Sequence, residues 1–219
     1  MKRITKMKTF LLSLTLCFTL LGFSQNDAKA KALLDQVSSK VKSYDNIALD
    51  FKYVLQNTAE NINQETRGDV VMEGDKYILN ILGITRIFDG KTLYSINPED
   101  EEVTISEENP EDEASITPSK MLSFYTHGYT YKMDAEKNIK GRKIQFVKLI
   151  PMDSNSEIKH VLLGIDPQTK HIYNLIEVGQ NSTQTTLTVT SFKTNQTLSK
   201  SLFTFDKNKY KNYYINKLN

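Results

Sequence analysis

The sequence predicts a mainly β protein of the α+β class, built on one large antiparallel sheet that is strongly curled or closed as a barrel. Segments rich in β-branched and aromatic residues recur between turn signals at regular spacing, which suggests about eleven strands. Only two segments look helical, and helices do not alternate with strands, which argues against a parallel sheet. A chain of 219 residues suits a single domain of this kind.

The N-terminus reads as an export signal. Residues 1–8 carry four basic side chains and no acid, residues 9–23 are apolar, and small residues precede a cleavage point after Ser24. We therefore expect a cleaved signal peptide at 1–24 and one domain at 25–219. An uncleaved anchor is the alternative, but an apolar run of about 15 residues is short for a hydrocarbon core of roughly 30 Å.

Loss of this signal changes the charge and the cysteine content. The chain has 28 Lys and Arg against 26 Asp and Glu, and four of the basic residues lie in the signal, so 24 basic residues would remain. The positive charge is thus no argument for nucleic acid, and we expect no nucleic-acid partner. Leu16 precedes Cys17 where a lipoprotein signal requires Gly or Ala, which argues against lipid attachment there. A mature chain without cysteine excludes thiol chemistry.

The first part of the expected domain reads as one helix followed by strands. Within Asp27–Ser43, apolar residues recur at helical spacing and form one stripe, whereas Ile47–Leu55 alternates as a half-buried strand does. The segments that follow read, in order, as a polar loop at Asn57–Glu65, strands at Thr66–Glu73 and Lys76–Leu82 around a Gly74-Asp75 turn, a break or bulge at Gly83, and a meander at Ile84–Phe88, Lys91–Ile96 and Val103–Ser106.

Two turns shape the meander. Asp89-Gly90 predicts a two-residue hairpin with a type I′ turn, because that turn requires positive φ at both central residues and Asp and Gly tolerate it. Asn97-Pro98-Glu99-Asp100 predicts the second turn, with Pro preset for an inner position.

An acidic run and a short helix separate the two halves of the chain. Glu99–Glu113 holds nine acids in fifteen residues and reads as a solvated loop, since the fixed ligand offsets of a calcium loop are missing. Thr117 is a suitable N-cap for a helix that ends near His127-Gly128. The remainder reads as alternating residues from Tyr129 to Met133, a loop at Ala135–Gly141, strands at Arg142–Pro151, Glu157–Asp166, His171–Val178, Thr183–Thr194 and Phe203–Asp206, and a partly loose polar tail at Asp206–Asn219.

The sequence contains no pattern that indicates a reaction centre. The three histidines, His127, His160 and His171, have no zinc-binding spacing, and nucleophile-elbow, Walker and dinucleotide motifs are missing. The carboxylates concentrate in the acidic run, where burial cannot raise their pKa. We therefore expect neither an enzyme nor a metal or cofactor site.

A curled sheet with a helical cover and no reactive groups suits a container for apolar chains. Alternate strand positions would line the cavity, and the apolar cluster of the short helix would form a lid. The face of Lys76–Leu82 that points inward stays undecided, and each lining residue could equally belong to an ordinary core. The candidates for contact with acyl chains are Leu49, Phe51, Tyr53, Met72, Tyr77, Leu79, Ile81 and Leu93 on strands, and Met121, Leu122 and Phe124 in the lid.

Four pieces of the chain, in order, resemble parts of one known protein family. A strand, DGKTLY at Asp89–Tyr94, and a strand ending in Asn97-Pro98 resemble the central signature of the LolA family of periplasmic lipoprotein carriers. Leu33–Phe51 resembles its opening helix and first strand, Thr117–Leu122 its middle helix, and Ser201–Phe205 its closing strand. No piece is specific alone, and the order and spacing behind an export signal carry the resemblance.

The resemblance implies a fold, a function and partners. The fold would be an incompletely closed antiparallel barrel covered by helices, and the protein would carry lipoprotein acyl chains through the periplasm as a monomer. An inner-membrane lipoprotein-releasing ABC transporter would supply the cargo, and an outer-membrane acceptor, where one exists, would take it. The alternative is a periplasmic lipid-binding or sensor module of the same fold. One departure concerns the lid: known members carry an Arg-Pro pair where this chain has Gly74-Asp75, so the family's latching arginine is not transferred.

Overall fold

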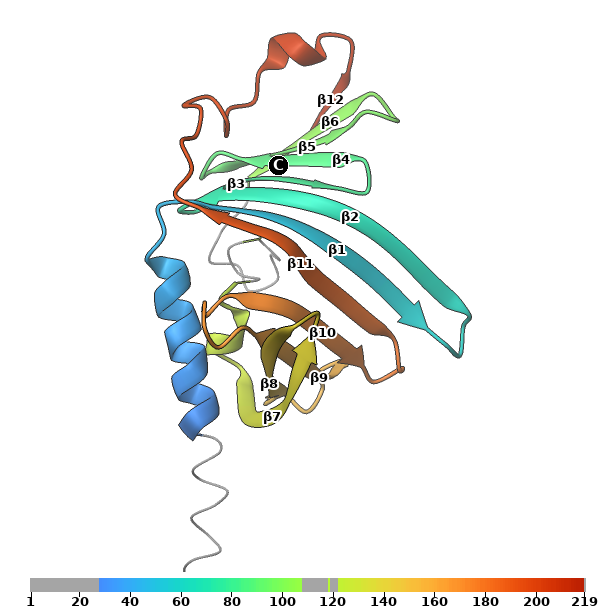
Figure 1. Ribbon diagram of the computed structural model, residues 1–219. Coiled ribbons are helices and arrows are strands. Elements are labelled where there is room, and N and C mark those ends of the chain that lie inside the picture. Colours follow the sequence, from blue (N-terminus) through green and yellow to red (C-terminus); the bar gives the residue numbers. More distant parts are fainter. Residues whose placement is uncertain (1–27, 108–117, 119–121, 219) are drawn as a thin grey trace, which may run out of the picture.

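One long sheet of twelve strands makes up most of the described chain (Figure 1). The computed structural model describes residues 28–107, 118 and 122–218, and the predicted fold class, mainly β with a curled open sheet, is confirmed. The strands are β1 (Ile47–Asn57), β2 (Ile62–Glu73), β3 (Lys76–Ile81), β4 (Ile84–Phe88), β5 (Thr92–Asn97), β6 (Glu102–Glu107), β7 (Tyr129–Ile139), β8 (Arg142–Pro151), β9 (Ile158–Ile165), β10 (Ile172–Gly179), β11 (Gln184–Thr194) and β12 (Tyr214–Lys217).

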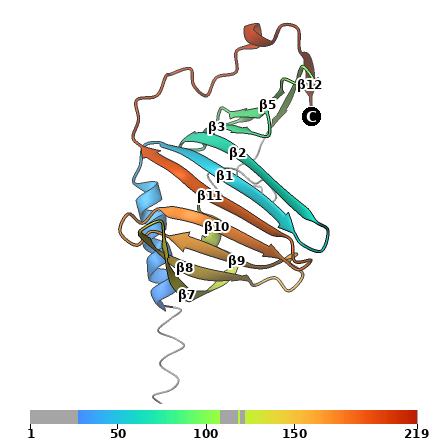
Figure 2. The same cartoon turned by 45° about the vertical axis from the view of Figure 1, so that its right-hand side comes forward.

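The sheet consists of two meanders joined by one long pairing. Its strand order is β12-β6-β5-β4-β3-β2-β1-β11-β10-β9-β8-β7, and the pairing of β1 with β11 brings the start of the domain beside its last third. All neighbours are antiparallel except β12, which is parallel to β6. The two views in Figures 1 and 2 show the sheet curving around one face, with β7 and β12 as separate edges. The sheet is therefore curled and open.

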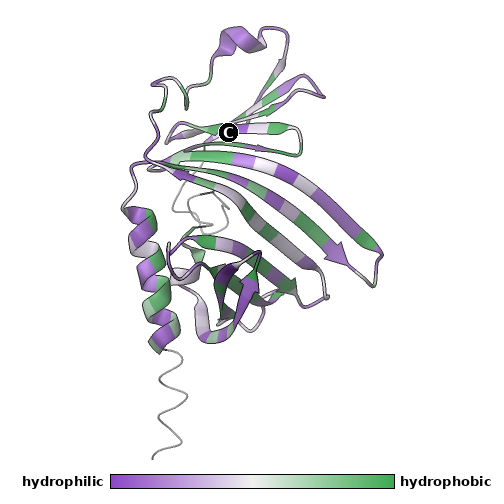
Figure 3. Cartoon of the chain, viewed as in Figure 1, coloured by the Kyte–Doolittle hydropathy of each residue, from purple (hydrophilic) through white to green (hydrophobic). Residues whose placement is uncertain are grey.

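The main hydrophobic core lies on the inner, concave face of this sheet. The N-terminal helix (residues 28–42) places Ala30, Leu34 and Val37 in that core, as the predicted apolar stripe requires. Hydrophobic and hydrophilic residues alternate along β1 and β11 in Figure 3, because successive side chains of a strand point to opposite faces. The same alternation therefore gives the long strands an apolar inner face and a more polar outer face.

The outer, convex face of β3–β6 carries a second, smaller core. Ile87, Ile96 and Val103 are buried there, and aromatic residues of the C-terminal segment cover them. The ring of Phe205 stacks on Tyr94, with centroids 4.6 Å apart. The C-terminal segment, which crosses this face and ends in β12, therefore fastens one end of the sheet.

The C-terminus differs from the prediction. Phe203–Asp206 forms no strand, and the tail after Asp206, which the sequence predicts to be partly loose, contains the 3₁₀-helix η2 (Lys207–Tyr210) and β12. Although the segment is polar overall, three of its aromatic residues meet the convex core, and their burial offsets the entropy of ordering the chain. These residues are Phe205, Tyr210 and Tyr213.

The two-residue type I′ turn lies at a different place from the one predicted. Asp89-Gly90 is not a two-residue turn, because β4 and β5 are joined by three residues of which only Gly90 has positive φ, at 102°. The Asp89 carboxylate instead accepts backbone hydrogen bonds from Lys91 and Thr92, at 2.9 and 2.8 Å. The type I′ geometry occurs at Leu82-Gly83, with φ of 53° and 77°, where the sequence suggested only a break or bulge.

Other boundaries differ from the predictions or cannot be compared. The predicted loop Ala135–Gly141 is mostly strand, because β7 continues through a bulge to Ile139. The predicted signal peptide, the last part of the acidic run, Thr117 and Met121 lie outside the described residues. The end of the predicted short helix contains a 3₁₀-helix, η1 (Phe124–Thr126).

The exposed turn residue Leu82 provides a test of the β3–β4 hairpin. A leucine at positive φ is strained, and this one leaves 71 % of its surface exposed, so little packing offsets the strain. Replacement by asparagine, which tolerates this conformation, should raise the free energy of unfolding by about 1 kcal/mol. Thermal and urea unfolding would measure the change. Leu82→Ala is the control, since it removes the same apolar surface but keeps the strain, and a Leu82→Asn protein no more stable than this control would contradict the assigned turn.

Candidate functional site

The concave face of the sheet holds an apolar cavity of about 320 Å³, called here the concave cavity. Six strands and the connection between β6 and β7 contribute to it. The lining residues are Leu49, Phe51 and Tyr53 of β1, Val70 and Met72 of β2, Leu79 and Ile81 of β3, Arg86 of β4, Ile172 and Leu175 of β10, Leu187 and Val189 of β11, and Pro118 and Leu122 of the connection.

Strand register explains why these particular side chains meet. Residues paired across neighbouring strands share a face, so each cross-strand row contributes one line of side chains to the cavity floor. Three successive rows do this: Arg86, Leu79, Val70 and Leu49 form one, Ile81, Gly68, Phe51 and Val189 form the next, and Tyr53, Leu187 and Leu175 form the third.

Gly68 in the middle row determines where the Phe51 ring lies. A β-carbon at Gly68 would approach the Phe51 ring and the Asn80 carbonyl oxygen to 2.6 Å. The missing side chain therefore lets the ring lie against the backbone of β2 instead of projecting into the cavity. This glycine helps to keep the space open.

The cover of the concave cavity comes from the β6–β7 connection. Pro118 and Leu122 are both buried and face the cavity. Directly after them, Tyr125 is fully buried, and burial raises the pKa of its hydroxyl to about 12. That hydroxyl has no hydrogen-bond partner among the described residues, so the Tyr125 side chain is held by packing.

An aromatic cluster fixes the end of the N-terminal helix to the sheet. The Tyr44 hydroxyl lies 2.7 Å from His171 Nε2, and the His171 ring stacks on Phe192 with centroids 3.9 Å apart. Burial lowers the pKa of His171, and the positive charge of Lys40 lowers it further. The neutral imidazole therefore joins the helix end, β11 and the turn before β10.

Glu177 is a half-buried carboxylate on the same concave face. It lies two residues beyond Leu175 on β10, and no hydrogen bond or ion pair to its side chain occurs within the described residues. Burial raises its pKa, and its charge in turn contributes to a raised pKa of Tyr129. Its ionisation therefore costs stability that no described partner offsets.

The sequence-predicted site residues divide into three groups. Those that line the concave cavity are Leu49, Phe51, Tyr53, Met72, Leu79, Ile81 and Leu122. Tyr77, Leu93 and Phe124 pack in or against the main core beside the cavity, and Met121 lies outside the described residues. The undecided face of β3 is the one that carries Leu79 and Ile81. Contact of any of these residues with a ligand stays a prediction.

Sequence reasoning missed half of the lining. The missed residues are Val70, Arg86, Pro118, Ile172, Leu175, Leu187 and Val189. Period-two alternation could have found Val70, two residues before Met72, and also Leu187 and Val189, the apolar positions of a threonine-rich strand. The pairing of β1 with β11, which brings the last two into the site, leaves no signal in a single sequence.

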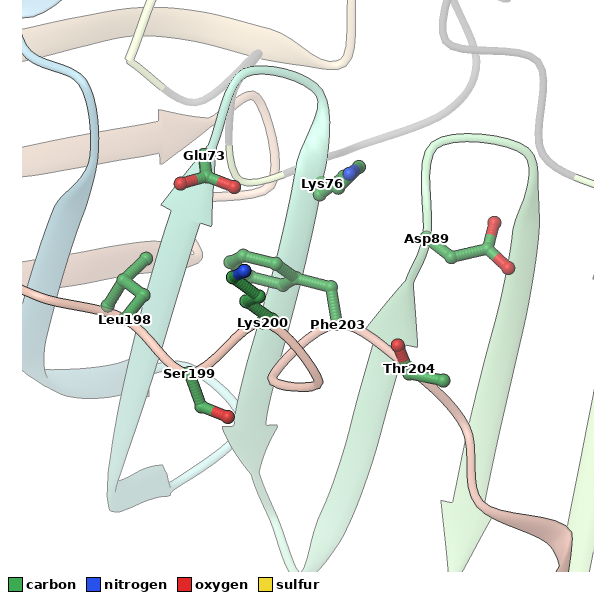
Figure 4. Close-up of a pocket in the computed structure, with 8 residues that line it drawn as sticks. All are labelled: Glu73, Lys76, Asp89, Leu198, Ser199, Lys200, Phe203 and Thr204. Carbon is green, nitrogen blue, oxygen red and sulfur yellow. The ribbon is translucent and has the colours of Figure 1, made fainter.

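A second pocket, on the surface, has a different character. It measures about 230 Å³ and lies between the β2–β3 turn, the start of the β4–β5 connection and residues 198–204, as Figure 4 shows. Glu73, Lys76, Asp89 and Lys200 supply charges of both signs, and only Phe203 among its labelled residues is buried. A site of mixed charge does not suit an apolar chain.

Comparisons with known proteins agree with this architecture. A family model described as outer membrane lipoprotein carrier protein LolA matches residues 83–206, more than half of the chain. No curated protein matches the chain.

Within the described residues, no helix has both the length and the apolar character needed to cross a membrane.

Several solved structures are similar at low sequence identity. An uncharacterized conserved protein from Thermus thermophilus is 11 % identical over 87 % of this chain and 99 % of its own, with a TM-score of 0.55. The lipoprotein LppX of Mycobacterium tuberculosis is 11 % identical over 79 % and 100 %, with a TM-score of 0.48. A LolA superfamily protein from Nitrosomonas europaea is 12 % identical over 81 % and 98 %, with a TM-score of 0.43. At 11 % identity, the likeness to the Thermus thermophilus protein supports the fold alone.

Because Glu177 is half-buried without a described partner, its replacement by a neutral residue should raise the stability of the protein by an amount that depends on pH. Because its pKa is raised, the protonated carboxyl stabilises the fold fully below the ordinary pKa of 4.5, and this contribution is lost as pH rises through the raised value. Glu177→Gln should therefore raise the melting temperature at pH 7 and change it much less at pH 4. Glu157→Gln, at an exposed position, is the control and should have little effect at either pH. A Glu177→Gln protein that is less stable than wild type at pH 7 would show that the carboxylate has a stabilising partner.

Proposed function

The chain belongs to the LolA family of outer membrane lipoprotein carrier proteins, and from this premise we propose that it carries lipoproteins with their acyl chains in the concave cavity. The observation that carries the proposal is the lining of that cavity, which is aliphatic or aromatic except for Arg86. No chemical step is part of the proposal, since carrying requires only binding and release.

The energetics of acyl chains make such a carrier necessary. Each methylene moved from water to an apolar site contributes about 0.8 kcal/mol, so a long chain does not leave a membrane for water unaided. A lining of Leu, Ile, Val and Met side chains offers this gain without fixed polar contacts. The apolar contacts also permit release, because no hydrogen bond to the acyl chain has to be broken.

The size of the concave cavity bears on how cargo enters. At about 320 Å³, it lies at the low end of the range of ligand sites, which is roughly 300–1,000 Å³. A lipoprotein with more than one acyl chain therefore requires the cover to move. Pro118 and Leu122 cover part of the cavity, and we propose that these two residues move aside as cargo enters.

The setting and the partners follow from the same proposal. We propose that residues 1–24 direct export, that the single domain 25–219 works in the periplasm as a monomer, and that an inner-membrane lipoprotein-releasing ABC transporter loads it. An outer-membrane acceptor would complete the route. A lipid-binding or sensor module of the same fold would use the same cavity, and the release assay below separates the two.

Filling the concave cavity tests the proposal. Leu175→Trp adds bulk to the cavity wall, whereas Ile176→Trp adds it on the opposite face of the same strand, where the side chain is half-buried. The tryptophan of Leu175→Trp should exclude two or more methylenes of the acyl chain from the cavity. Binding of a fluorescent synthetic triacylated lipopeptide should therefore weaken about tenfold or more. Ile176→Trp should bind as wild type does.

The same variants should differ in release of lipoproteins from spheroplasts, with Leu175→Trp impaired and Ile176→Trp normal. Circular dichroism melts on the same samples would show whether both variants fold. Lipopeptide binding without lipoprotein release by the wild type would favour the lipid-binding module, and normal binding by a folded Leu175→Trp protein would place the acyl site elsewhere.

A further inference from the structure

Arg86 is the one charged side chain among the described residues that line the concave cavity. It lies on β4 directly opposite Leu79 of β3 and Ser95 of β5, so it shares the concave face with them. Its side chain is exposed, which places the guanidinium at the rim of the cavity rather than in its depth. A bound chain would thus have its apolar part against the rows of β1–β3 and one end near this arginine.

The described residues give this guanidinium no hydrogen-bond or ion-pair partner. Its neighbour Ser95 is neutral, and the row continues to Thr104 on β6. The carboxylate of Glu102, on the same face of β6, accepts hydrogen bonds from Thr104 at 3.1 Å and Asn216 at 3.2 Å. Glu177, a further carboxylate on the concave face, lies on β10, with four strands between it and β4. Among the described residues, the cation at the rim is therefore available to a ligand.

An unpaired guanidinium beside an apolar cavity selects for a particular kind of ligand. A ligand that covers the rim removes water from the arginine, and an anionic group replaces that water best, because a carboxylate or phosphate offers both the opposite charge and two oxygens that match the guanidinium fork. The rest of the ligand must be apolar to occupy the cavity. These two requirements together describe an amphiphile with a carboxylate or a phosphate at one end of an acyl chain.

We propose that Arg86 binds the anionic headgroup of an amphiphile whose acyl chain lies in the concave cavity. This role of Arg86 rests on the proposed function, because it requires the cavity to hold acyl chains. It adds that the charge of the headgroup determines which amphiphiles bind best. The carrier would then accept free fatty acids or acidic phospholipids in addition to acylated proteins, whose neutral ester and amide groups offer Arg86 less.

Ligands with one chain and different headgroups test this proposal. The probes are palmitate, palmitoyl-lysophosphatidic acid and neutral monopalmitoylglycerol, each below its critical micelle concentration, with inorganic phosphate as the probe without a chain. The wild type should bind one or both anionic amphiphiles about tenfold or more tightly than the neutral one. Tight palmitate binding identifies a carboxylate ligand, tight lysophosphatidic acid binding a phosphate ligand, and inorganic phosphate alone should bind weakly or not at all.

The variant Arg86→Gln should lose this preference, so that the anionic and neutral amphiphiles bind it with similar affinities. Arg67→Gln is the matched control, because Arg67 is an exposed arginine on the opposite face of β2, and it should behave as wild type does. Arg86→Lys should retain part of the preference, since it keeps the charge and loses the planar fork.

The possible failures are distinct. Equal wild-type affinity for all three amphiphiles, a preference that survives Arg86→Gln, or a preference lost equally in Arg67→Gln would overturn the role of Arg86 and leave the acyl cavity intact. Tight binding of inorganic phosphate would also overturn it, because the anion site would then work without a chain. If the wild type binds none of the amphiphiles and no lipopeptide, the proposed function itself fails.

Discussion

A wide sheet that curls around one face must fill that face, and this requirement organises the whole molecule. The long strands β1, β2 and β11 each place apolar side chains inward at alternate positions, and no second sheet packs against them within the described residues. The N-terminal helix covers part of the concave face with a stripe of small and aliphatic residues. The part that the helix and the β6–β7 connection leave unfilled is the concave cavity. Hydrophobic burial thus stabilises the fold and creates its site at once.

The convex face shows the opposite arrangement. Apolar residues of β4–β6 would be exposed on it, and the chain covers them with its own C-terminal aromatic residues instead of leaving a second site. The parallel pairing of β12 with β6 holds that cover in place. Among the described residues, the concave cavity is therefore the apolar site that the chain does not cover with its own C-terminal segment, and Arg86 is the one charged residue in its lining.

Much of the fold follows from local patterns in the sequence, and the rest depends on contacts between distant residues. The alternation of Leu49, Phe51 and Tyr53 predicts both β1 and its inward face, because period two needs only neighbouring residues. The pairing that adds Leu187 and Val189 joins β1 to a strand near the far end of the chain and has no local signal. The residue types also give the wrong turn at Asp89-Gly90, where the aspartate side chain instead accepts a backbone hydrogen bond. The two-residue turn lies at Leu82-Gly83, although a leucine is strained at positive φ. Arg86 reads in sequence as an ordinary surface charge, and only the register places it beside Leu79.

Methyl-selective NMR can show whether acyl chains occupy the concave face. With isotope-labelled leucine and isoleucine methyl groups and a synthetic triacylated lipopeptide, we predict intermolecular NOEs from the acyl chain to Leu49, Leu79 and Leu175 in the concave cavity. We expect no NOEs to Ile87 in the convex core or to Leu82 at the exposed turn. Chain contacts confined to Ile87 or Leu82, with the cavity methyl groups unaffected, would contradict this placement of the acyl chains.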